Sequence, residues 1–394
     1  DLRLVAGSRN AGRLRWNTPA PEDIAPDAWQ QAMTAIAEEL EHTRAGLDSV
    51  SELAPDFARL AARAQALADT VRAFMQPAAP DTVRWLDVAG TLRLTESPLD
   101  IADMVRTRLL GHGQPENQED KRTPAGDEAA EIPCRSWIFV SATLGDDERL
   151  SWFTEPCGLE AARILRIGSP FDYARQAALY VPPDIVRPSD PAHSAQVARL
   201  ASDAAAQLGG RTLILTTTLR ALRAIGDLLT ERLGATLDVL VQGQLPKRVI
   251  LERFLQGGAD GGRGCVLVAS GSFWQGVDVP GDALQLVVID KLPFPPPGDP
   301  LVDARSRRLQ AQGRSPFADF SLPEAAVALK QGAGRLIRRE TDRGIIVICD
   351  TRLTTMSYGR RLLAALPPMR RLADAPAFEA ALAELAQIPV GSDS

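Results

Sequence analysis

The 394-residue chain carries 44 lysines and arginines against 50 aspartates and glutamates, which gives a formal net charge of −6. It contains no run of 18 apolar residues, so a membrane-spanning helix is excluded. We expect a soluble protein of two or three domains, each of about 100–200 residues. The negative charge argues against indiscriminate binding of polyanions, but a local basic groove is compatible with it because salt screens charges over about 8–10 Å.

The sulfur and imidazole side chains form no recognisable site. No C-x-x-C pair occurs, so we interpret the cysteines as small buried hydrophobic residues of a reducing compartment, and we expect the histidines on the surface. Asp1 opens the chain and no signal-peptide pattern follows it, which indicates a processed or shortened chain. The cysteines are Cys134, Cys157, Cys265 and Cys349, and the histidines are His42, His112 and His193.

The first third of the chain predicts a helical hairpin. Apolar residues recur at helical spacing over Asp27–Leu47 and Pro55–Phe74, and a short break separates the two runs. Further along, Val83–Val88 and Thr91–Leu94 predict a strand pair, and a helix with Pro98 in its first turn is expected over Leu99–Leu110. Residues 111–133 are polar and aperiodic, which is typical of a linker or insertion, and we assign them no ligand.

From Trp137 onward the pattern alternates between strands and helices. Trp137–Val140 predicts a buried strand that runs into Ser141–Gly145, with a helix over Asp146–Phe153. Small hydroxylated residues at the carboxyl end of a parallel strand lie where open α/β sheets bind ligands. The alternative is an ordinary helix start after a strand.

After residue 163 the alternation becomes regular and predicts a parallel sheet with right-handed crossovers. Its strands are continuous apolar runs, as expected when helices cover both faces. The candidate strands are Arg163–Ile167, Gln176–Val181, Thr212–Thr216, Leu237–Gln242, Gly264–Ala269, Leu284–Ile289 and Gly344–Cys349. The candidate helices are Ser194–Leu208, Leu219–Leu233, Lys247–Leu255, Pro323–Arg339, Leu353–Leu366 and Ala377–Leu385.

Two loops follow strands of this sheet. Thr216-Thr217-Thr218 offers hydroxyl and N–H groups to a phosphodiester backbone, with a plain helix cap as the alternative. In the second loop, residues 270–281, the glycines permit a sharp path. There Asp278 can orient an arginine or a water, and Trp274 is an apolar or stacking wedge. The alternative for this loop is a tight turn without a ligand.

The third feature is the stretch KQGAGRLIRR, from Lys330 to Arg339. If it is helical, Gln331, Arg335 and Arg338 share one face. Guanidinium groups bind phosphate oxygens bidentately, and an arginine supplied in trans to a nucleoside triphosphate can accelerate its hydrolysis by roughly 10³–10⁵. The alternative is a solvated basic helix that makes surface ion pairs.

Together these segments resemble a known family. SATLG, GSFWQGVDVPG and QGAGRLIRR are similar to motifs III, V and VI of the superfamily 2 DNA helicases of the DinG/YoaA and XPD type, and LILTTT resembles motif IV. VRWLDVAG…LRLTESPLDIADMV resembles the family's return from its helical arch to the first motor domain. The resemblance implies an α/β fold with a RecA-like (P-loop-NTPase-like) parallel sheet covered by helices, preceded by an α-helical arch hairpin.

The resemblance also implies domain boundaries. Residues 1–110 form an arch-like helical domain with its return segment, and residues 111–133 form the linker or insertion. Residues 134–162 supply the last strand and helix of motor domain 1, and residues 163–394 form motor domain 2.

Site roles follow from the same resemblance. Catalytic roles at the triphosphate, as finger and phosphate clamp with a nearby amide, fall to Arg335, Arg338 and Gln331. A link between nucleotide and DNA, and a relay between motors, fall to Gly276, Asp278, Ser141 and Thr143. Contacts with DNA fall to Thr216, Thr217, Ser272 and Trp274, and no residue is expected to bind a metal.

Departures from the family pattern limit what this chain does. It contains no G-x-x-x-x-G-K-[ST] and no DEAH-like pair. In the family both lie upstream of the arch, as do the cysteines of an iron–sulfur cluster. We therefore expect ATP and Mg²⁺ to be bound mainly by an upstream part, the cluster to lie upstream only, and the cysteines present here not to be cluster ligands.

The resulting hypothesis is the carboxyl-terminal portion of an ATP-dependent 5′–3′ DNA helicase, inactive by itself. Its expected setting is the bacterial cytoplasm, with single-stranded DNA and a replication or repair protein as partners and no membrane. The alternative from another class is a non-catalytic module that binds DNA or a protein. A nucleotide-binding regulatory protein is a weaker alternative because the chain has no phosphate cradle.

Overall fold

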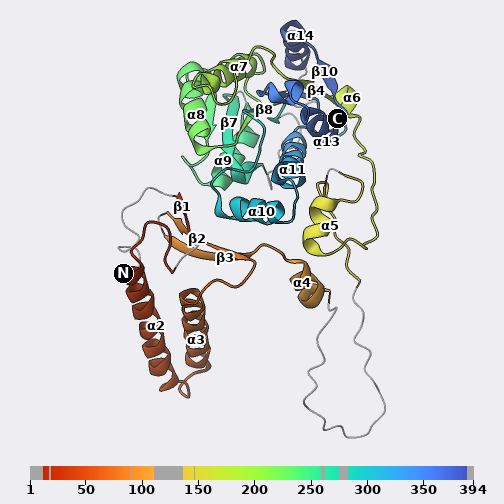
Figure 1. The fold of residues 1–394 in the computed structure, drawn as a ribbon. Helices are drawn as coiled ribbons and strands as arrows, with labels where there is room; N and C mark the ends of the chain where they lie inside the picture. Colours follow the sequence, from red (N-terminus) through yellow and green to blue (C-terminus); the bar gives the residue numbers. More distant parts are fainter. Residues whose placement is uncertain are drawn as a thin grey trace. The chain divides into compact units, whose positions relative to one another are not determined.

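The computed structural model describes residues 12–16, 19–89, 91–110, 136–145, 147–258, 262–274 and 283–387. The chain divides into two compact units, which Figure 1 shows as ribbons. The hairpin unit comprises Asp1–Arg135, Pro156–Gly158 and Pro296–Pro316, and the sheet unit comprises Ser136–Glu155, Leu159–Pro295 and Phe317–Ser394. In the part of the chain that the structure describes, no helix is long and apolar enough to cross a membrane. The domain boundaries given above stay predictions.

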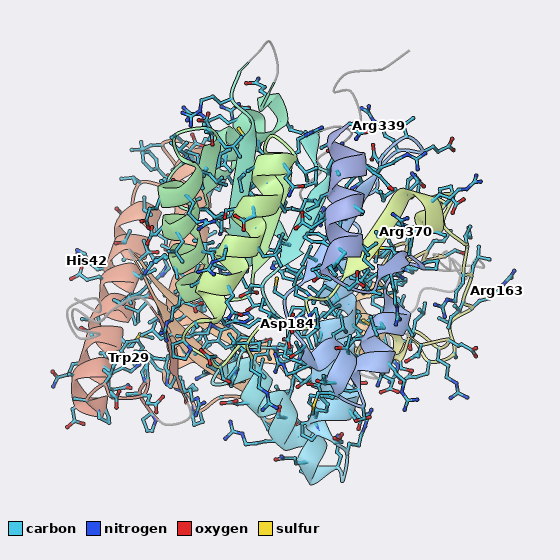
Figure 2. The ribbon with its side chains drawn as sticks, turned by 90° about the horizontal axis from the view of Figure 1, so that it is seen from above. Trp29, His42, Arg163, Asp184, Arg339 and Arg370 are labelled. Atoms are coloured by element: carbon cyan, nitrogen blue, oxygen red, sulfur yellow. The ribbon has the colours of Figure 1, made fainter. Side chains whose placement is uncertain are left out.

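The predicted helical hairpin is confirmed as α2 (Pro26–Asp48) and α3 (Pro55–Met75). Each helix begins with a proline in its first turn and an acidic residue beside it, which suits the unpaired N–H groups and the positive end of the helix dipole. Trp29 of α2 is buried, whereas His42 projects outward from α2, as predicted (Figure 2).

The predicted strand pair is confirmed within a three-stranded antiparallel sheet of order β1-β2-β3. Its strands are β1 (Gly12–Arg15), β2 (Thr82–Val88) and β3 (Leu92–Pro98). The helix predicted over Leu99–Leu110 is wrong in extent, because β3 continues to Pro98, which pairs with Thr82. Only α4 (Ala102–Met104) and a π-helical turn, Val105–Leu109, remain of it.

Like β1, one helix of the hairpin unit was not predicted from sequence: α10 (Pro300–Ala311). Asp299 caps it by accepting N–H groups from the first turn. Its residues Leu301 and Ala304 pack with Val83 and Trp85 of β2. Ion pairs add to this contact: Arg13 with Asp299, Arg15 with Asp303, and Arg308 with Asp100.

The sheet unit confirms the predicted parallel sheet, with strand order β10-β4-β9-β8-β5-β7-β6. This is the strand–helix alternation of a RecA-like fold. The strands are β4 (Ala177–Tyr180), β5 (Thr212–Thr216), β6 (Asp238–Val241), β7 (Cys265–Ser270), β8 (Leu286–Ile289), β9 (Gly344–Ile348) and β10 (Arg370–Leu372).

Helices cover both faces of this sheet (Figure 1), and successive strand residues enter opposite cores. In β5, Leu213 and Leu215 belong to one core and Ile214 to the other. The first core includes α9 (Lys247–Gln256), α11 (Leu322–Ala333), α12 (Arg352–Thr355) and α13 (Gly359–Ala365). The second includes α7 (His193–Gln207), α8 (Leu219–Leu233) and α14 (Ala375–Ala386). Shorter helices are α5 (Ser151–Cys157), α6 (Tyr173–Gln176), the 3₁₀ turn Gly271–Phe273 and the π turn Phe317–Ser321.

Two predicted strands are wrong. Trp137–Val140 and Arg163–Ile167 pair with no strand among the described residues. Ile138 is 85% exposed and Val140 is 87% exposed, so these side chains meet solvent rather than a core. An apolar run becomes a strand only where a neighbouring strand satisfies its N–H and C=O groups.

Two predicted helices are also shifted. The helix expected over Asp146–Phe153 begins only at Ser151, because Asp147 Oδ1 accepts the Ser151 N–H at 3.0 Å and closes a turn first. The helix expected over Leu353–Leu366 is broken by a turn between α12 and α13.

Candidate functional site

Three predicted segments meet at Trp274. Its indole Nε1 donates to the carbonyl oxygen of Thr216 at the end of β5, at 3.2 Å. The Arg335 guanidinium donates to the carbonyl oxygen of Trp274, from Nη2 at 2.7 Å and from Nε at 3.2 Å. A Cβ placed on Gly332 of α11 would lie 2.9 Å from the indole ring. The threonine loop, the loop after β7 and the arginine stretch therefore form one assembly.

Burial of Trp274 corrects one expectation. Trp274 and its neighbour Phe273 both lie in the sheet-unit core, so neither presents a ring for stacking on a base. Ser272 lies in the 3₁₀ turn between them and β7, and its side chain is outside the described part of the chain. Gly276 and Asp278 are also outside the described residues.

The predicted helix over Pro323–Arg339 is wrong at its carboxyl end. It stops at Ala333, with Gly334 as its cap, so Arg335 and Arg338 do not continue the face that carries Gln331. Asp342 Oδ2 accepts the N–H groups of Arg338 at 2.7 Å and Arg339 at 2.8 Å, which turns the chain toward β9. Helical spacing therefore does not relate these side chains.

The turn places the two predicted arginines differently. Arg335 is 8% exposed, whereas Arg338 is exposed. Gln176 Nε2 secures the turn from the other side by donating to the carbonyl oxygens of Arg339, Glu340 and Asp342. Arg335 thus lies inside the assembly, and Arg338 lies on its surface.

Gln331 contacts the SATLG segment. Its Nε2 donates to Thr143 Oγ1 at 3.2 Å, and Ser141 Oγ accepts the Thr143 N–H at 3.1 Å. Beside it on α11, burial and the nearby Arg166 lower the pKa of Lys330. The structure therefore brings Ser141 and Thr143 to the helix that carries Gln331, in a region rich in positive charge.

The threonine loop faces inward more than the sequence predicts. Thr216 is buried, and its hydroxyl donates to the Ala269 carbonyl oxygen at 3.2 Å. The Thr217 N–H donates to Asp290 Oδ1 at 3.0 Å. Thr218 caps α8 by accepting the Ala221 N–H at 3.2 Å. What the loop exposes is the start of α8: Thr218, Leu219 and Arg220.

Two residues at this edge were missed from sequence: Asp290, directly after β8, and His193, the first residue of α7. The surface position predicted for His193 is wrong, because its imidazole lies 2.9 Å from the carbonyl oxygens of both Val186 and Asp290 and is 3% exposed. The sequence did hold a signal for Asp290, an acid that directly follows the apolar run LVVI.

A second buried acid, Asp350, follows β9. It accepts the Leu292 N–H at 3.0 Å and pairs with Arg352, so the ends of β8 and β9 are tied together. The hydrogen bonds from Arg352 to Asp350 raise the pKa of that arginine. This contact supports the edge of the sheet without reaching the threonine loop.

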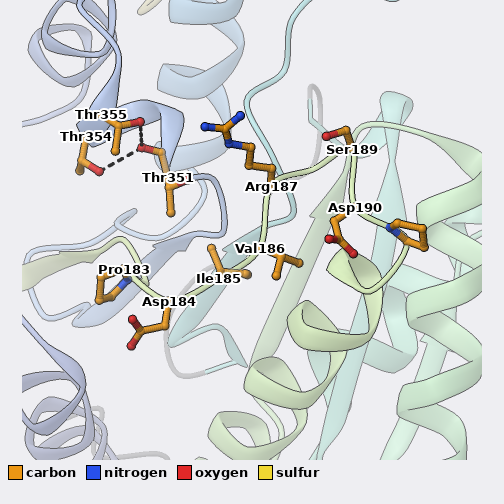
Figure 3. A pocket seen from close by; sticks show the side chains of 11 residues that line it. Pro183, Asp184, Ile185, Val186, Arg187, Ser189, Asp190, Thr351, Thr354 and Thr355 are labelled. Atoms are coloured by element: carbon orange, nitrogen blue, oxygen red, sulfur yellow. Dashed lines mark hydrogen bonds between the residues drawn. The ribbon is translucent and has the colours of Figure 1, made fainter.

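An open groove of about 790 Å³ lies near this edge (Figure 3). Thr354 and Thr355 line it and donate their hydroxyls to the Thr351 carbonyl oxygen, at 3.0 and 2.9 Å. Asp184, Arg187 and Asp190 contribute two carboxylates against one guanidinium. That balance does not favour a polyanion, so we assign the groove no ligand.

The described cysteines lie in separate elements, and Cys157, in α5, is half-buried rather than buried as predicted. Cys265 lies in β7 and Cys349 directly after β9, both buried, as predicted, and burial raises the pKa of each thiol. A cluster needs thiolates gathered at one point. Within the described residues, no group of three or more His, Cys, Asp or Glu side chains is placed to hold a metal ion.

Comparisons with known protein families and sequences all find similarity to helicases. Residues 202–369 match the helicase C-terminal domain family. The chain is 44% identical over 239 residues to the ATP-dependent DNA helicase YoaA of Escherichia coli (strain K12), which covers 61% of this chain and 36% of that helicase. It is 34% identical over 331 residues to the ATP-dependent helicase DinG of Mycobacterium tuberculosis, which covers 81% of this chain and 46% of that helicase.

The chain thus spans less than half the length of these two relatives. A solved XPD helicase structure superimposes with a TM-score of 0.50 and 13% identity, over 94% of this chain and 60% of that one. At this identity the match bears on the fold alone.

Proposed function

We propose that this chain, which is homologous to the YoaA and DinG helicases and contains a helicase C-terminal domain, supplies the arch and the second motor domain of an ATP-dependent DNA helicase. The observation that supports the proposal best is the assembly at Trp274. There Arg335, predicted to act on the nucleotide, donates to the backbone carbonyl of Trp274. Thr216, predicted to contact DNA, accepts a hydrogen bond from the indole of the same tryptophan.

The nucleotide side consists of Arg335, Arg338 and Gln331. Their guanidinium and amide groups suit the oxygens of a triphosphate, and they donate most strongly to charge that develops on the transferred phosphoryl group. Mg²⁺, when bound with ATP, would help to neutralise charge that develops on the phosphate, and we propose that upstream residues would hold it. An iron–sulfur cluster is likewise proposed to lie upstream only.

The coupling between nucleotide and DNA passes through short contacts. If Arg335 moves toward a phosphate, its hydrogen bond to the Trp274 carbonyl shifts the position of Trp274. Because the indole of Trp274 is hydrogen-bonded to the end of β5, that strand end shifts with it. The chain after Trp274 contains Gly276 and Asp278, the residues proposed to link nucleotide and DNA. Thr143, which accepts from Gln331, and Ser141, which accepts from the Thr143 N–H, are proposed to relay the same change to the first motor domain.

On the DNA side, Thr216 and Thr217 are proposed to act mainly by shaping the exposed start of α8, and Ser272 is proposed as a further DNA contact. The translocation direction is proposed to be 5′–3′, in the bacterial cytoplasm, with a replication or repair protein as a partner. Trp137–Val140, which is exposed here, is proposed to add as a strand to the sheet of motor domain 1.

Alanine substitution of Arg335 in the complete protein tests this proposal. We expect Arg335→Ala to lower DNA-stimulated ATP turnover by roughly 10³-fold or more while DNA affinity changes little, because the residue acts on the phosphoryl group. The matched control is Arg339→Ala, four residues on and exposed. Equal turnover of the two variants, measured by steady-state ATPase assay, would remove the role of Arg335.

The alternative function, a non-catalytic DNA- or protein-binding module, is favoured by the missing phosphate cradle in this sequence. Binding of single-stranded DNA by the chain at several salt concentrations tests it, because phosphate contacts give a linear dependence on log salt. DNA binding by a complete protein that shows no DNA-stimulated ATPase would favour the module.

A further inference from the structure

Asp290 occupies an unusual position for a carboxylate. It is fully buried, and its Oδ1 accepts the N–H groups of Thr217 at 3.0 Å and Lys291 at 2.8 Å. Its Oδ2 makes no hydrogen bond within the described part of the chain and lies 3.5 Å from Lys291 Nζ. One carboxylate therefore joins the ends of β5 and β8, and its second oxygen faces the Lys291 ammonium.

His193 holds the backbone of the same residue. Its two ring nitrogens each lie 2.9 Å from a carbonyl oxygen, those of Val186 and Asp290. The ring comes from α7, so Asp290 is fixed by three elements: its carbonyl by α7, and its carboxylate by the ends of β5 and β8. The position of Asp290 therefore fixes the position of the Thr217 peptide, which its carboxylate holds.

Stability alone does not explain a carboxylate here. Burial raises the pKa of Asp290 to about 6, against the opposing effects of Lys291, the Thr217 N–H and His193. This folded-state pKa lies above the ordinary value of 3.8. Protonated Asp290 therefore contributes fully to the free energy of unfolding below about pH 4, and that contribution is lost as the pH rises through about 6. A neutral amide accepts the same two N–H groups without that loss.

The other charged or titratable groups near Asp290 belong to β9 and its end. Burial and then the charge of Asp290 raise the pKa of Cys349, and Asp350 forms an ion pair with Arg352. Neither side chain has a hydrogen bond to Thr217. The carboxylate of Asp290 is thus the single side chain at this edge that bonds the Thr217 peptide among the described residues.

We propose that Asp290 is a positioning residue for DNA binding: its ionised carboxylate holds the Thr217 peptide and so presents Thr218, Leu219 and Arg220 to a phosphodiester backbone. The inference rests on the proposed function. It adds a residue that contacts no DNA itself, and it predicts that loss of the charge weakens DNA binding without weakening the fold.

The test is the affinity of this chain for a fluorescein-labelled oligothymidylate at fixed salt between pH 5 and 8, with the melting temperature measured alongside. Wild-type affinity is expected to fall as the pH falls through about 6, the pKa to which burial raises Asp290. Asp290→Asn should bind roughly 10-fold more weakly at pH 7.5, since its neutral amide oxygen accepts the Thr217 N–H more weakly than the charged carboxylate does, and should lack that fall. Its melting temperature at pH 7.5 should equal or exceed that of the wild type.

Asp350→Asn is the matched control, because Asp350 is equally buried but does not contact Thr217. It should keep the wild-type pH profile. Arg220→Ala removes an exposed group that Asp290 is proposed to present, so the losses of Arg220→Ala and Asp290→Asn should not add. If Asp290→Asn does not fold, Arg220→Ala still tests the inference, because it should remove the fall of DNA affinity between pH 8 and pH 5.

Wild-type affinity and pH profile in Asp290→Asn would overturn the inference and leave the proposed function standing. An affinity loss that tracks a lower melting temperature would also overturn it, because the role would then be structural. No DNA binding by the wild-type chain at any pH would overturn this inference and would count against the proposed DNA side of the helicase.

Discussion

At the scale of single residues, Trp274 connects its neighbours through hydrogen bonds of its backbone carbonyl and its indole nitrogen rather than through its aromatic face. It receives the Arg335 guanidinium on its carbonyl and donates to Thr216. A buried tryptophan whose N–H finds a carbonyl is well suited to hold two loops in register. The residue therefore connects segments that are far apart in sequence, which a stacking wedge on the surface would not do.

Gly332→Ala tests the close packing at this point. In an ordinary helix interior the change stabilises by up to about 1 kcal/mol. Here the new Cβ would lie 2.9 Å from the indole of Trp274, so we expect the sheet unit to lose about 1–3 kcal/mol of unfolding free energy, measured in urea.

The control for this change is Gly168→Ala, where a Cβ meets nothing within 4 Å. It should change the stability by less than about 0.5 kcal/mol. Equal urea midpoints for the two variants would show that the indole yields without strain, against the packing described.

Part of the site was accessible from sequence. The arginine stretch and the loops after β5 and β7 could be found because each follows or precedes a recognisable apolar run. Asp290 and His193 could not be assigned, because their partners lie 73 and 97 positions away in the chain. No local pattern reports such a contact.

At the scale of elements, α11 shows how a cap overrides a periodic pattern. The apolar spacing continues into Leu336 and Ile337, which are buried, yet the helix has already ended at Gly334. Asp342 accounts for this by bonding two N–H groups of the following turn. A side-chain acceptor placed after a helix competes with continued helix formation.

Trp137–Val140 supports a prediction of its own. Its amides should exchange with deuterium rapidly in this chain, because no described strand pairs with them. In the complete protein the same amides should be protected by at least about 10²-fold if the segment joins the sheet of motor domain 1. Residues 213–215 of β5 serve as the protected control in both samples, and equally fast exchange of Trp137–Val140 in the complete protein would contradict the assignment.

At the scale of the whole molecule, the division into units does not follow the order of the chain. Pro296–Pro316 lies in the sequence between β8 and α11 of the sheet unit, yet it packs in the hairpin unit. Apolar contacts with β2 and ion pairs with Asp81 and Asp100 hold it there. A single chain thus crosses between the units more than once.

The proposed division of labour with an upstream part predicts the behaviour of the chain by itself. With neither a phosphate cradle nor a DEAH-like pair in its sequence, the purified 394-residue chain should show no ATP hydrolysis above background, with or without single-stranded DNA. A coupled-enzyme assay measures this, and the complete protein is the positive control. DNA-stimulated turnover by the chain would contradict the proposal.

The sequence by itself determined six of the sheet unit's parallel strands, β4 to β9, most of its helices and the helical hairpin, because apolar periodicity and proline or glycine signals act over neighbouring residues; the edge strand β10 was missed. Tertiary structure alone decided that Trp137–Val140 pairs with no strand of the described chain, that Arg335 is buried against Trp274, and that His193 and Asp290 lie together. Strand pairing and buried polar contacts depend on partners brought from distant parts of the chain, and their free energy is set only when those partners meet.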